Sequence, residues 1–109
     1  MSLTWALEQQ GYDVVTCFDG SSALLAADDF HPQVILLDIG MPVMNGLEVC
    51  RRIRATPALQ ATSVYAQTGW GDNVMRQQTR EAGFDQHMTK PINLDGLLAM
   101  IEADVTGIQ

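Results

Sequence analysis

The stretch VILLDIGMPVMNG, residues 34–46, contains a run of four apolar residues that ends in a lone carboxylate, Asp38. An apolar run of this length, bounded by turn residues, is typical of a strand that is covered on both faces. Open α/β sheets place their ligands at the carboxyl ends of their strands. The stretch therefore predicts a buried strand with a site at its end.

The composition indicates a single globular domain. A chain of 109 residues can build one modest core. Its 47% hydrophobic and 17% charged residues are typical of a folded, soluble chain. The formal net charge of −7, with only six basic residues, argues against direct binding of nucleic-acid phosphates. Arg51, Arg52 and Arg54 fall on one expected helix, and we interpret them as its solvated face.

Neither a membrane segment nor a secretory leader is visible in the sequence. No apolar run approaches the roughly 18 residues that span a bilayer, and the N-terminal residues lack a charged region followed by an apolar one. We therefore expect a cytoplasmic protein without a membrane partner. Cys17 and Cys50 are interpreted as reduced core residues, and neither has the spacing of a metal site.

Strand and helix patterns alternate along the chain. Strands separated by helices of this length imply parallel pairing with right-handed crossovers. The sequence therefore predicts an α/β fold, an open, doubly wound parallel sheet with helices on both faces. Helices are predicted at 2–11, 20–30, 45–55, 72–83 and 93–105, and strands at 12–17, 33–38, 62–68 and 85–90.

Several residues are typical of helix ends. Gly11 is expected to form a left-handed C-terminal cap, Ser21 or Ser22 to cap the second helix, and Asn93 to cap the last. The helix at 72–83 is mostly polar and has a thin apolar stripe. We expect it to be weakly held or partly exposed, as a contact surface.

Three of the predicted strands end in Asp38, Thr68 and Lys90. In a parallel sheet these residues finish on the same edge, so they are expected to converge. A carboxylate can accept a phosphoryl group as an acyl phosphate. An ammonium and a hydroxyl can then bind the new oxygens and charge. Pro91 fixes the exit of the last strand and is a candidate for a cis peptide bond.

Three segments, LLDIGMPVMNG (36–46), TGW (68–70) and KP (90–91), resemble the receiver domain of bacterial two-component response regulators in order and spacing. The resemblance covers residues 4–108, nearly the whole chain. It implies a flavodoxin-like signalling module that is not an enzyme. Such a module accepts a phosphoryl group from a histidine kinase or phosphotransfer protein and switches a partner-binding face.

The resemblance also implies a role for each matching residue. Asp38 would be the phosphoacceptor, Thr68 the switch hydroxyl and Lys90 the ammonium that pairs with the phosphate. Asp38 and the backbone carbonyl of Gly40 would contribute to a Mg²⁺ site. His87 stands where the family carries a rotameric switch residue, and a partly exposed strand histidine without a role is an equal alternative.

The sequence departs from the family pattern at its start. A receiver opens with a hydrophobic strand that ends in two or three acidic residues, which hold the magnesium, whereas residues 1–11 match the later part of the family's first helix. Asp13, Asp19 and Glu48 are poorly placed as substitutes. We therefore expect residues 1–109 to form a single, N-terminally truncated receiver-like domain, with Mg²⁺ bound weakly or not at all because magnesium needs near-octahedral oxygen ligands.

Two alternatives to a competent phosphoacceptor receiver are open. The first is a truncated or degenerate receiver that is not efficiently phosphorylated and acts as a protein-interaction module. The second is a small-molecule enzyme or binding protein on a related fold, such as a flavin carrier. That class needs a phosphate-cradling loop, and the sequence contains no G-x-G-x-x-G turn.

The missing strand would be central in the flavodoxin-like order 2-1-3-4-5. An open gap would leave backbone N–H and C=O groups unpaired on two strand edges, which is costly for a small domain. The sequence therefore predicts either a four-stranded sheet, in which residues 12–17 pair directly with 33–38, or a dimer in which another copy fills the slot. A homodimer through residues 72–105 is a further possibility.

Overall fold

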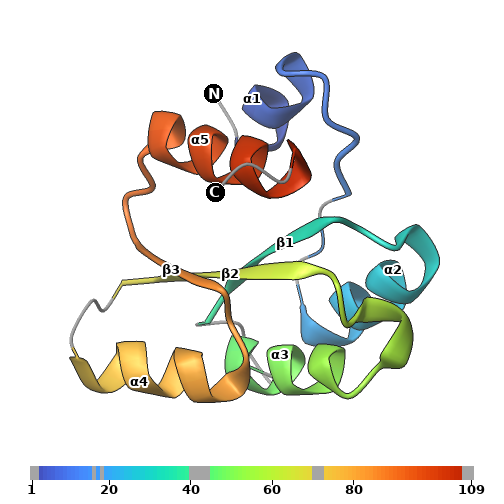
Figure 1. Ribbon diagram of the computed structural model, residues 1–109, viewed down its shortest axis with the longest axis vertical. Coiled ribbons are helices and arrows are strands. Elements are labelled where there is room, and N and C mark those ends of the chain that lie inside the picture. Colours follow the sequence, from blue (N-terminus) through green and yellow to red (C-terminus); the bar gives the residue numbers. More distant parts are fainter. Residues whose placement is uncertain (1–2, 16, 18, 40–44, 70–72, 107–109) are drawn as a thin grey trace.

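The computed structural model describes residues 3–15, 17, 19–39, 45–69 and 73–106 (Figure 1). These residues form a parallel sheet with helices on both faces, as predicted. The strands are β1 (Val34–Asp38), β2 (Ser63–Thr68) and β3 (Gln86–Thr89). The helices are α1 (Leu3–Gln9), α2 (Gly20–Phe30), α3 (Gly46–Arg54), α4 (Asn73–Ala82) and α5 (Leu94–Thr106), with a 3₁₀ turn, η1 (Pro57–Leu59).

The sheet has the order β1-β2-β3, with β2 between the other two strands. Asp38 pairs with Gln67, and Thr68 with Thr89. Helices α1 and α5 lie on one face, and α2, α3 and α4 on the other (Figure 1). The described helices include none that is long and apolar enough to cross a membrane.

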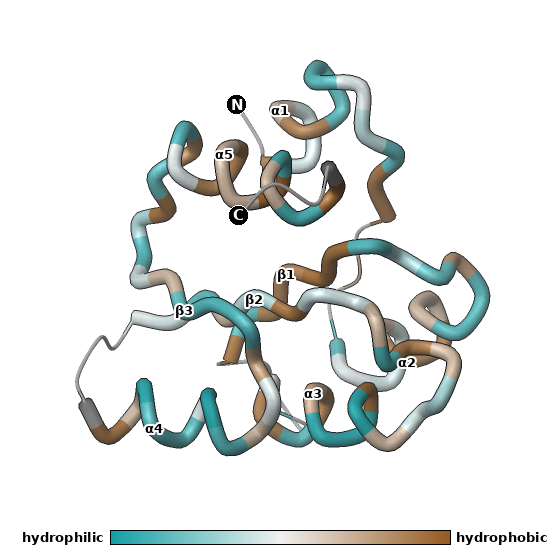
Figure 2. Tube along the Cα trace, in the orientation of Figure 1, coloured by the Kyte–Doolittle hydropathy of each residue, from teal (hydrophilic) through white to brown (hydrophobic). Residues whose placement is uncertain are grey.

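Alternating residues of β2 build two separate cores. Val64 and Ala66 belong to the cluster under α2, α3 and α4, while Tyr65 packs with Leu97 and Ile101 of α5 on the other face. This alternation follows from the period of two in a strand. Figure 2 shows apolar residues along β1 and part of β2, whereas α4 is hydrophilic along most of its length.

The predicted strand at 12–17 is wrong. Residues 12–15 and 17 have no strand conformation, and β1 is the edge of the sheet in the part of the chain that the structure describes. A strand needs a ladder partner, and a cavity separates residues 12–15 from β1. The four-stranded sheet expected for the single chain is therefore wrong as well, whereas filling by a second copy stays a prediction.

The complete burial that we expected for residues 34–37 of β1 is found on β2 instead. In β1, only Leu37 is buried, while Val34, Ile35 and Leu36 are partly exposed. In β2, Val64, Tyr65 and Ala66 are fully buried. The difference arises because β2 has strands on both sides, whereas β1 borders the cavity.

The helix ends were predicted in part. Gly11 has a φ of +90° after α1, and Asn93 Oδ1 accepts a hydrogen bond from Gly96 N at 2.9 Å. The N-cap of α2 is Asp19 rather than Ser21 or Ser22, because Asp19 Oδ1 accepts the N–H of Ser22 at 2.8 Å. This backbone hydrogen bond lowers the pKa of the Asp19 carboxyl.

Arg54 departs from the solvated face predicted for three arginines. Arg51 and Arg52 are exposed beside Glu48, as expected. The Arg54 side chain is largely buried and bridges α3 to two loops. It donates hydrogen bonds to Gly83 O at 2.9 Å, Thr62 O at 2.8 Å and Asp85 Oδ2 at 2.7 Å.

Candidate functional site

The carboxyl ends of the three strands bring Asp38 and Lys90 together. Asp38 ends β1, Thr68 ends β2, and Lys90 directly follows β3. Lys90 Nζ donates a hydrogen bond to Asp38 Oδ2 at 2.6 Å. Lys90 N donates to Thr68 O at 2.8 Å, so Thr68 lies on the strand between the two charged residues. The edge of the sheet therefore carries a carboxylate, an ammonium and a hydroxyl.

The Asp38–Lys90 pair is open to solvent. The Lys90 and Asp38 side chains are 44% and 41% exposed. An ion pair as exposed as this contributes at most about 1 kcal/mol to stability, because water screens the charges. The pair therefore places a reachable oxygen nucleophile beside a fixed positive charge, and its value for folding is small.

Backbone hydrogen bonds fix the end of β3 beside β2. The Lys90–Pro91 peptide bond is cis, as the sequence suggested. Thr68 is buried at the end of β2, next to exposed Gly69. Gly40, the predicted carbonyl ligand for magnesium, lies outside the described residues.

Gly46 brings α3 against the end of β1. Gly46 N donates a hydrogen bond to Ile39 O at 3.2 Å. A Cβ atom at this position would lie 2.9 Å from both Asp38 O and Ile39 Cα, closer than real Cβ contacts. The turn motif that pointed to Gly46 in the sequence therefore has a steric reason, the close approach of two backbones.

His87 is joined to α4 through a threonine. His87 is half-buried on β3, and its Nδ1 lies 3.2 Å from Thr79 Oγ1. The Thr79 hydroxyl also donates to Arg76 O at 3.0 Å, and Thr79 is almost completely buried. Sequence reasoning missed Thr79, although a hydroxyl among the apolar positions of a polar helix was a signal for it.

The described residues do not by themselves fit a magnesium ion. Mg²⁺ prefers six oxygen ligands in near-octahedral geometry. Asp38 supplies one carboxylate, and the Lys90 ammonium already occupies one of its oxygens. Across the described ranges, no group of three or more His, Cys, Asp or Glu side chains could hold a metal ion.

A model of a known protein family matches nearly the whole chain. Residues 1–102 match the model of the response regulator receiver domain. The chain belongs to this family. Membership places it in two-component signalling, whose receivers are signalling modules that interact with histidine kinases or phosphotransfer proteins.

Two curated receiver relatives have closely similar sequences. The protein PilG of Pseudomonas aeruginosa is 35% identical over 99 residues, which are 91% of this chain and 73% of PilG. The DNA-binding response regulator MtrA of Mycolicibacterium smegmatis is 36% identical over 101 residues, 93% of this chain but only 43% of MtrA. The chain thus spans less than half the length of MtrA.

Solved receiver structures share the flavodoxin-like fold. Chemotaxis protein CheY4 of Vibrio cholerae superposes with a TM-score of 0.86 at 29% identity, covering 92% of this chain and 83% of CheY4. The receiver domain of the sensor histidine kinase PA1611 of Pseudomonas aeruginosa has a TM-score of 0.83 at 26% identity, covering 92% of this chain and 82% of that domain. That domain holds a magnesium ion in its active-site cleft.

Proposed function

We propose that this receiver accepts a phosphoryl group on Asp38 from a histidine kinase or a histidine phosphotransfer protein. The observation that carries the proposal is the 2.6 Å contact between Lys90 Nζ and Asp38 Oδ2 at a solvent-exposed edge of the sheet. Asp38 is reachable, and the positive charge needed to stabilise a phosphorylated carboxylate is already beside it.

The transfer is a nucleophilic displacement at phosphorus. A carboxylate oxygen of Asp38 forms a bond to phosphorus while the phosphorus–nitrogen bond of the donor phosphohistidine breaks. The bonding electron pair returns to the imidazole. Lys90 then pairs with the phosphoryl oxygens, and the hydroxyl of Thr68 donates a hydrogen bond to one of them.

The signal leaves through β3 and α4. Recruitment of the Thr68 hydroxyl to the phosphoryl group changes the packing beside His87, which moves as a switch residue. His87 contacts Thr79 of α4 at 3.2 Å, so its movement shifts the helix. The partner-binding face is formed by residues 72–105, where exposed Val74 offers an apolar contact.

The net charge of the domain and the oxygen ligands at the site bear on two further properties, nucleic-acid binding and Mg²⁺ binding. The net charge of −7 supports the proposal that the domain itself does not bind nucleic acid, even though a relative is named as DNA-binding. A single described carboxylate at the site supports weak Mg²⁺ binding. Because weak Mg²⁺ binding would slow phosphorylation, the second candidate function is a receiver that is poorly phosphorylated and serves as a protein-interaction module.

Phosphorylation by acetyl phosphate separates the two functions. Intact mass spectrometry, with and without Mg²⁺, should show one added phosphoryl group on the natural chain and none on Asp38→Asn. The matched control is Asp29→Asn, which removes an exposed carboxylate of α2 and should keep the label. An unlabelled natural chain would favour the interaction module, and a labelled Asp38→Asn chain would exclude Asp38 as acceptor.

The interaction face has its own test. Val74→Glu places a charge on an exposed apolar residue of α4 and should weaken association without unfolding the domain. Sedimentation of the phosphorylated and unphosphorylated chains measures this. If neither form changes its hydrodynamic size with the substitution or with concentration, the face does not mediate self-association.

A further inference from the structure

The Asp38–Lys90 ion pair crosses β2, the strand that separates β1 from β3. Asp38 pairs in register with Gln67 of β2. Gln67 pairs in turn with Met88 of β3, two residues before Lys90. Neighbouring strands of a sheet lie about 4.8 Å apart. Gln67 is therefore the residue of the middle strand that stands level with Asp38 and directly beside it.

The side chains of Asp38 and Gln67 leave the sheet on the same face. Side chains alternate between the two faces along a strand. Leu36 and Tyr65, each two residues earlier on the same strands, belong to the apolar cluster that packs against α5, and so does Met88. Gln67 therefore projects on the α5 face of the sheet, beside the carboxylate of Asp38.

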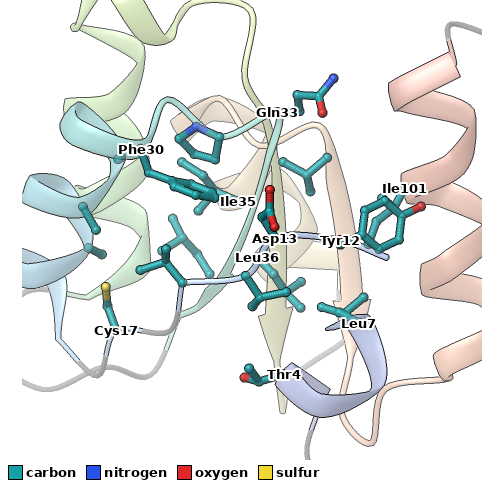
Figure 3. A pocket seen from close by; sticks show the side chains of 18 of the residues that line it. Thr4, Leu7, Tyr12, Asp13, Cys17, Phe30, Gln33, Ile35, Leu36 and Ile101 are labelled. Atoms are coloured by element: carbon teal, nitrogen blue, oxygen red, sulfur yellow. The ribbon is translucent and has the colours of Figure 1, made fainter. Parts of the chain in front are cut away.

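Asp38 and Gln67 also line the same cavity, which has a volume of about 640 Å³ (Figure 3). Figure 3 shows Leu36, two residues before Asp38, among the side chains that line it. A phosphoryl group brings three strong acceptor oxygens to the residue that carries it. On Asp38, these oxygens have room in the space that Gln67 also borders.

The carboxamide of Gln67 is available as a hydrogen-bond donor. Its backbone carbonyl accepts the N–H of Ile39 at 3.0 Å, which fixes the residue beside β1. Within the described parts of the chain, its side chain makes no hydrogen bond, although the residue is half-buried. Its neighbours on this face, Tyr65 and Met88, pack in the apolar cluster. A polar group without a partner is costly in such surroundings, so packing alone does not account for a glutamine here.

Phosphorylation of Asp38 would give this donor a partner. The phosphoryl group adds about −1.5 to −2 charges at neutral pH, and Lys90 Nζ supplies one positive charge beside it. Hydrogen bonds to charged oxygens are roughly twice as strong as those between neutral groups. Because the unmodified Asp38 carboxylate makes no hydrogen bond with Gln67, a bond to the phosphoryl group would favour the phosphorylated state specifically.

We propose that Gln67 is a phosphoryl-binding residue, whose side-chain Nε2–H donates a hydrogen bond to a phosphoryl oxygen on Asp38, beside the Lys90 ammonium. This role rests on the proposed function, because it needs a phosphoryl group on Asp38. Gln67 forms no bond to phosphorus and transfers no proton. Its donor raises the occupancy of the phosphorylated state relative to the unmodified carboxylate.

Two substitutions separate hydrogen-bond donation from packing. Gln67→Leu removes the amide and suits the apolar neighbours, so a purely structural role expects it to be tolerated. Gln67→Lys keeps a donor and fits those neighbours less well. The matched control is Gln86→Leu, which changes an exposed glutamine of β3 that pairs with Tyr65, two positions before Gln67. Urea unfolding of each variant establishes that it is folded.

The measurement is the rate at which each chain gains and loses its phosphoryl group. Intact mass spectrometry follows the gain in acetyl phosphate at a fixed Mg²⁺ concentration, and the loss after acetyl phosphate is removed. Both reactions pass through similar loose transition states at phosphorus. The ratio of the two rate constants therefore measures the stabilisation of the phosphorylated state, whether the hydrogen bond forms before or after the transition state.

The proposal expects this ratio to fall about tenfold or more in Gln67→Leu, as for the loss of a hydrogen bond to a charged group. In Gln67→Lys and Gln86→Leu the ratio should be largely retained. An unchanged ratio in Gln67→Leu would overturn the proposal, and so would equal losses in Gln67→Leu and Gln67→Lys, or an equal loss in Gln86→Leu.

Gln67→Glu tests the same claim if Gln67→Leu does not fold. It keeps the size of the side chain and replaces the donor by an acceptor, so the ratio should fall, and an unchanged ratio would overturn the role of Gln67. Failure of the proposed function itself looks different, because the natural chain would then gain no phosphoryl group on Asp38. A natural chain labelled on Asp38, with Gln67→Leu behaving identically, would overturn the Gln67 role alone.

Discussion

Lys90 Nζ lies 2.6 Å from Asp38 Oδ2, although 52 residues separate the two in sequence and β2 lies between their strands. The contact crosses the carboxyl edge of the sheet. It places an ammonium where new negative charge would appear on a phosphorylated Asp38. Because both side chains are substantially exposed, the ion pair adds little to the free energy of unfolding, whereas its carboxylate is accessible to a phosphoryl donor.

Lys90→Met should separate these two contributions. Loss of an exposed ion pair is expected to change the free energy of unfolding by less than about 1 kcal/mol. The lifetime or yield of the phosphorylated state should fall, because no ammonium pairs with the phosphoryl oxygens. Urea titration and intact mass spectrometry measure the two effects. A large loss of stability with unchanged phosphorylation would show instead that Lys90 serves the fold and not the phosphorylated state.

Gly46→Ala should disturb the end of β1. The added Cβ would lie 2.9 Å from Asp38 O, and overpacking of this kind typically costs about 1–3 kcal/mol. The matched control is Gly96→Ala in α5, where the nearest atom to a Cβ is 3.6 Å away. That change should stabilise the helix by about 0.5–1 kcal/mol. Thermal unfolding of both variants tests the contrast, and similar effects would refute it.

Arg54→Met should destabilise the fold where Arg51→Met does not. Arg54 donates to Gly83 O, Thr62 O and Asp85 Oδ2, so its removal leaves polar groups unpaired and should cost about 2–3 kcal/mol. Arg51 is exposed, and its replacement should change stability by at most about 0.5 kcal/mol. Denaturant midpoints compare the two, and equal midpoints would contradict the bridging role.

Alkaline pH should weaken the fold through Cys50. Burial raises the pKa of the Cys50 thiol from 9.0 to about 11. The unfolded chain therefore loses this proton first as the pH rises from 9, and stability falls until the folded thiol ionises near 11, by on the order of 2 kcal/mol. Burial also raises the pKa of Tyr65, whose hydroxyl donates a hydrogen bond to Asp104. This shift likewise lowers stability as the pH rises.

Unfolding in urea from pH 8 to 11 measures this dependence. Cys50→Ala should be less stable at pH 8, because a buried side chain is truncated, and should show a shallower fall above pH 9. Cys17→Ala is the control, since Cys17 is only partly buried. An identical pH slope in Cys50→Ala and the natural chain would exclude Cys50 as the cause.

The parts of the fold that depend on local pattern were predictable from the sequence. Parallel strands end on one edge, so the meeting of Asp38 and Lys90 followed from strand order alone. The cap at Asn93 followed from residue type and position. The N-cap of α2 could not be predicted in the same way. Asp19 and the two serines are all suitable cap residues, and the exact start of the helix decides that Asp19 Oδ1 accepts the Ser22 N–H.

Features that depend on distant partners were not predictable. Residues 12–15 have a strand-like pattern, but strand formation needs a neighbour, and the cavity beside β1 removes it. Arg54 lies on the same polar-patterned helix as Arg52, yet three acceptors from other segments hold it in place. The Thr79–His87 contact joins α4 to β3 in the same way. Tertiary partners decided each of these cases.

Trapping the phosphorylated residue with borohydride tests the central claim most directly. An acyl phosphate on aspartate is reduced to an alcohol, which converts the residue to homoserine, whereas a phosphate on a hydroxyl or imidazole is not reduced in this way. After treatment with acetyl phosphate, peptide mass mapping should find homoserine at position 38 and at no other aspartate. Homoserine elsewhere, or a stable phosphate on Thr68 with Asp38 unmodified, would contradict the account.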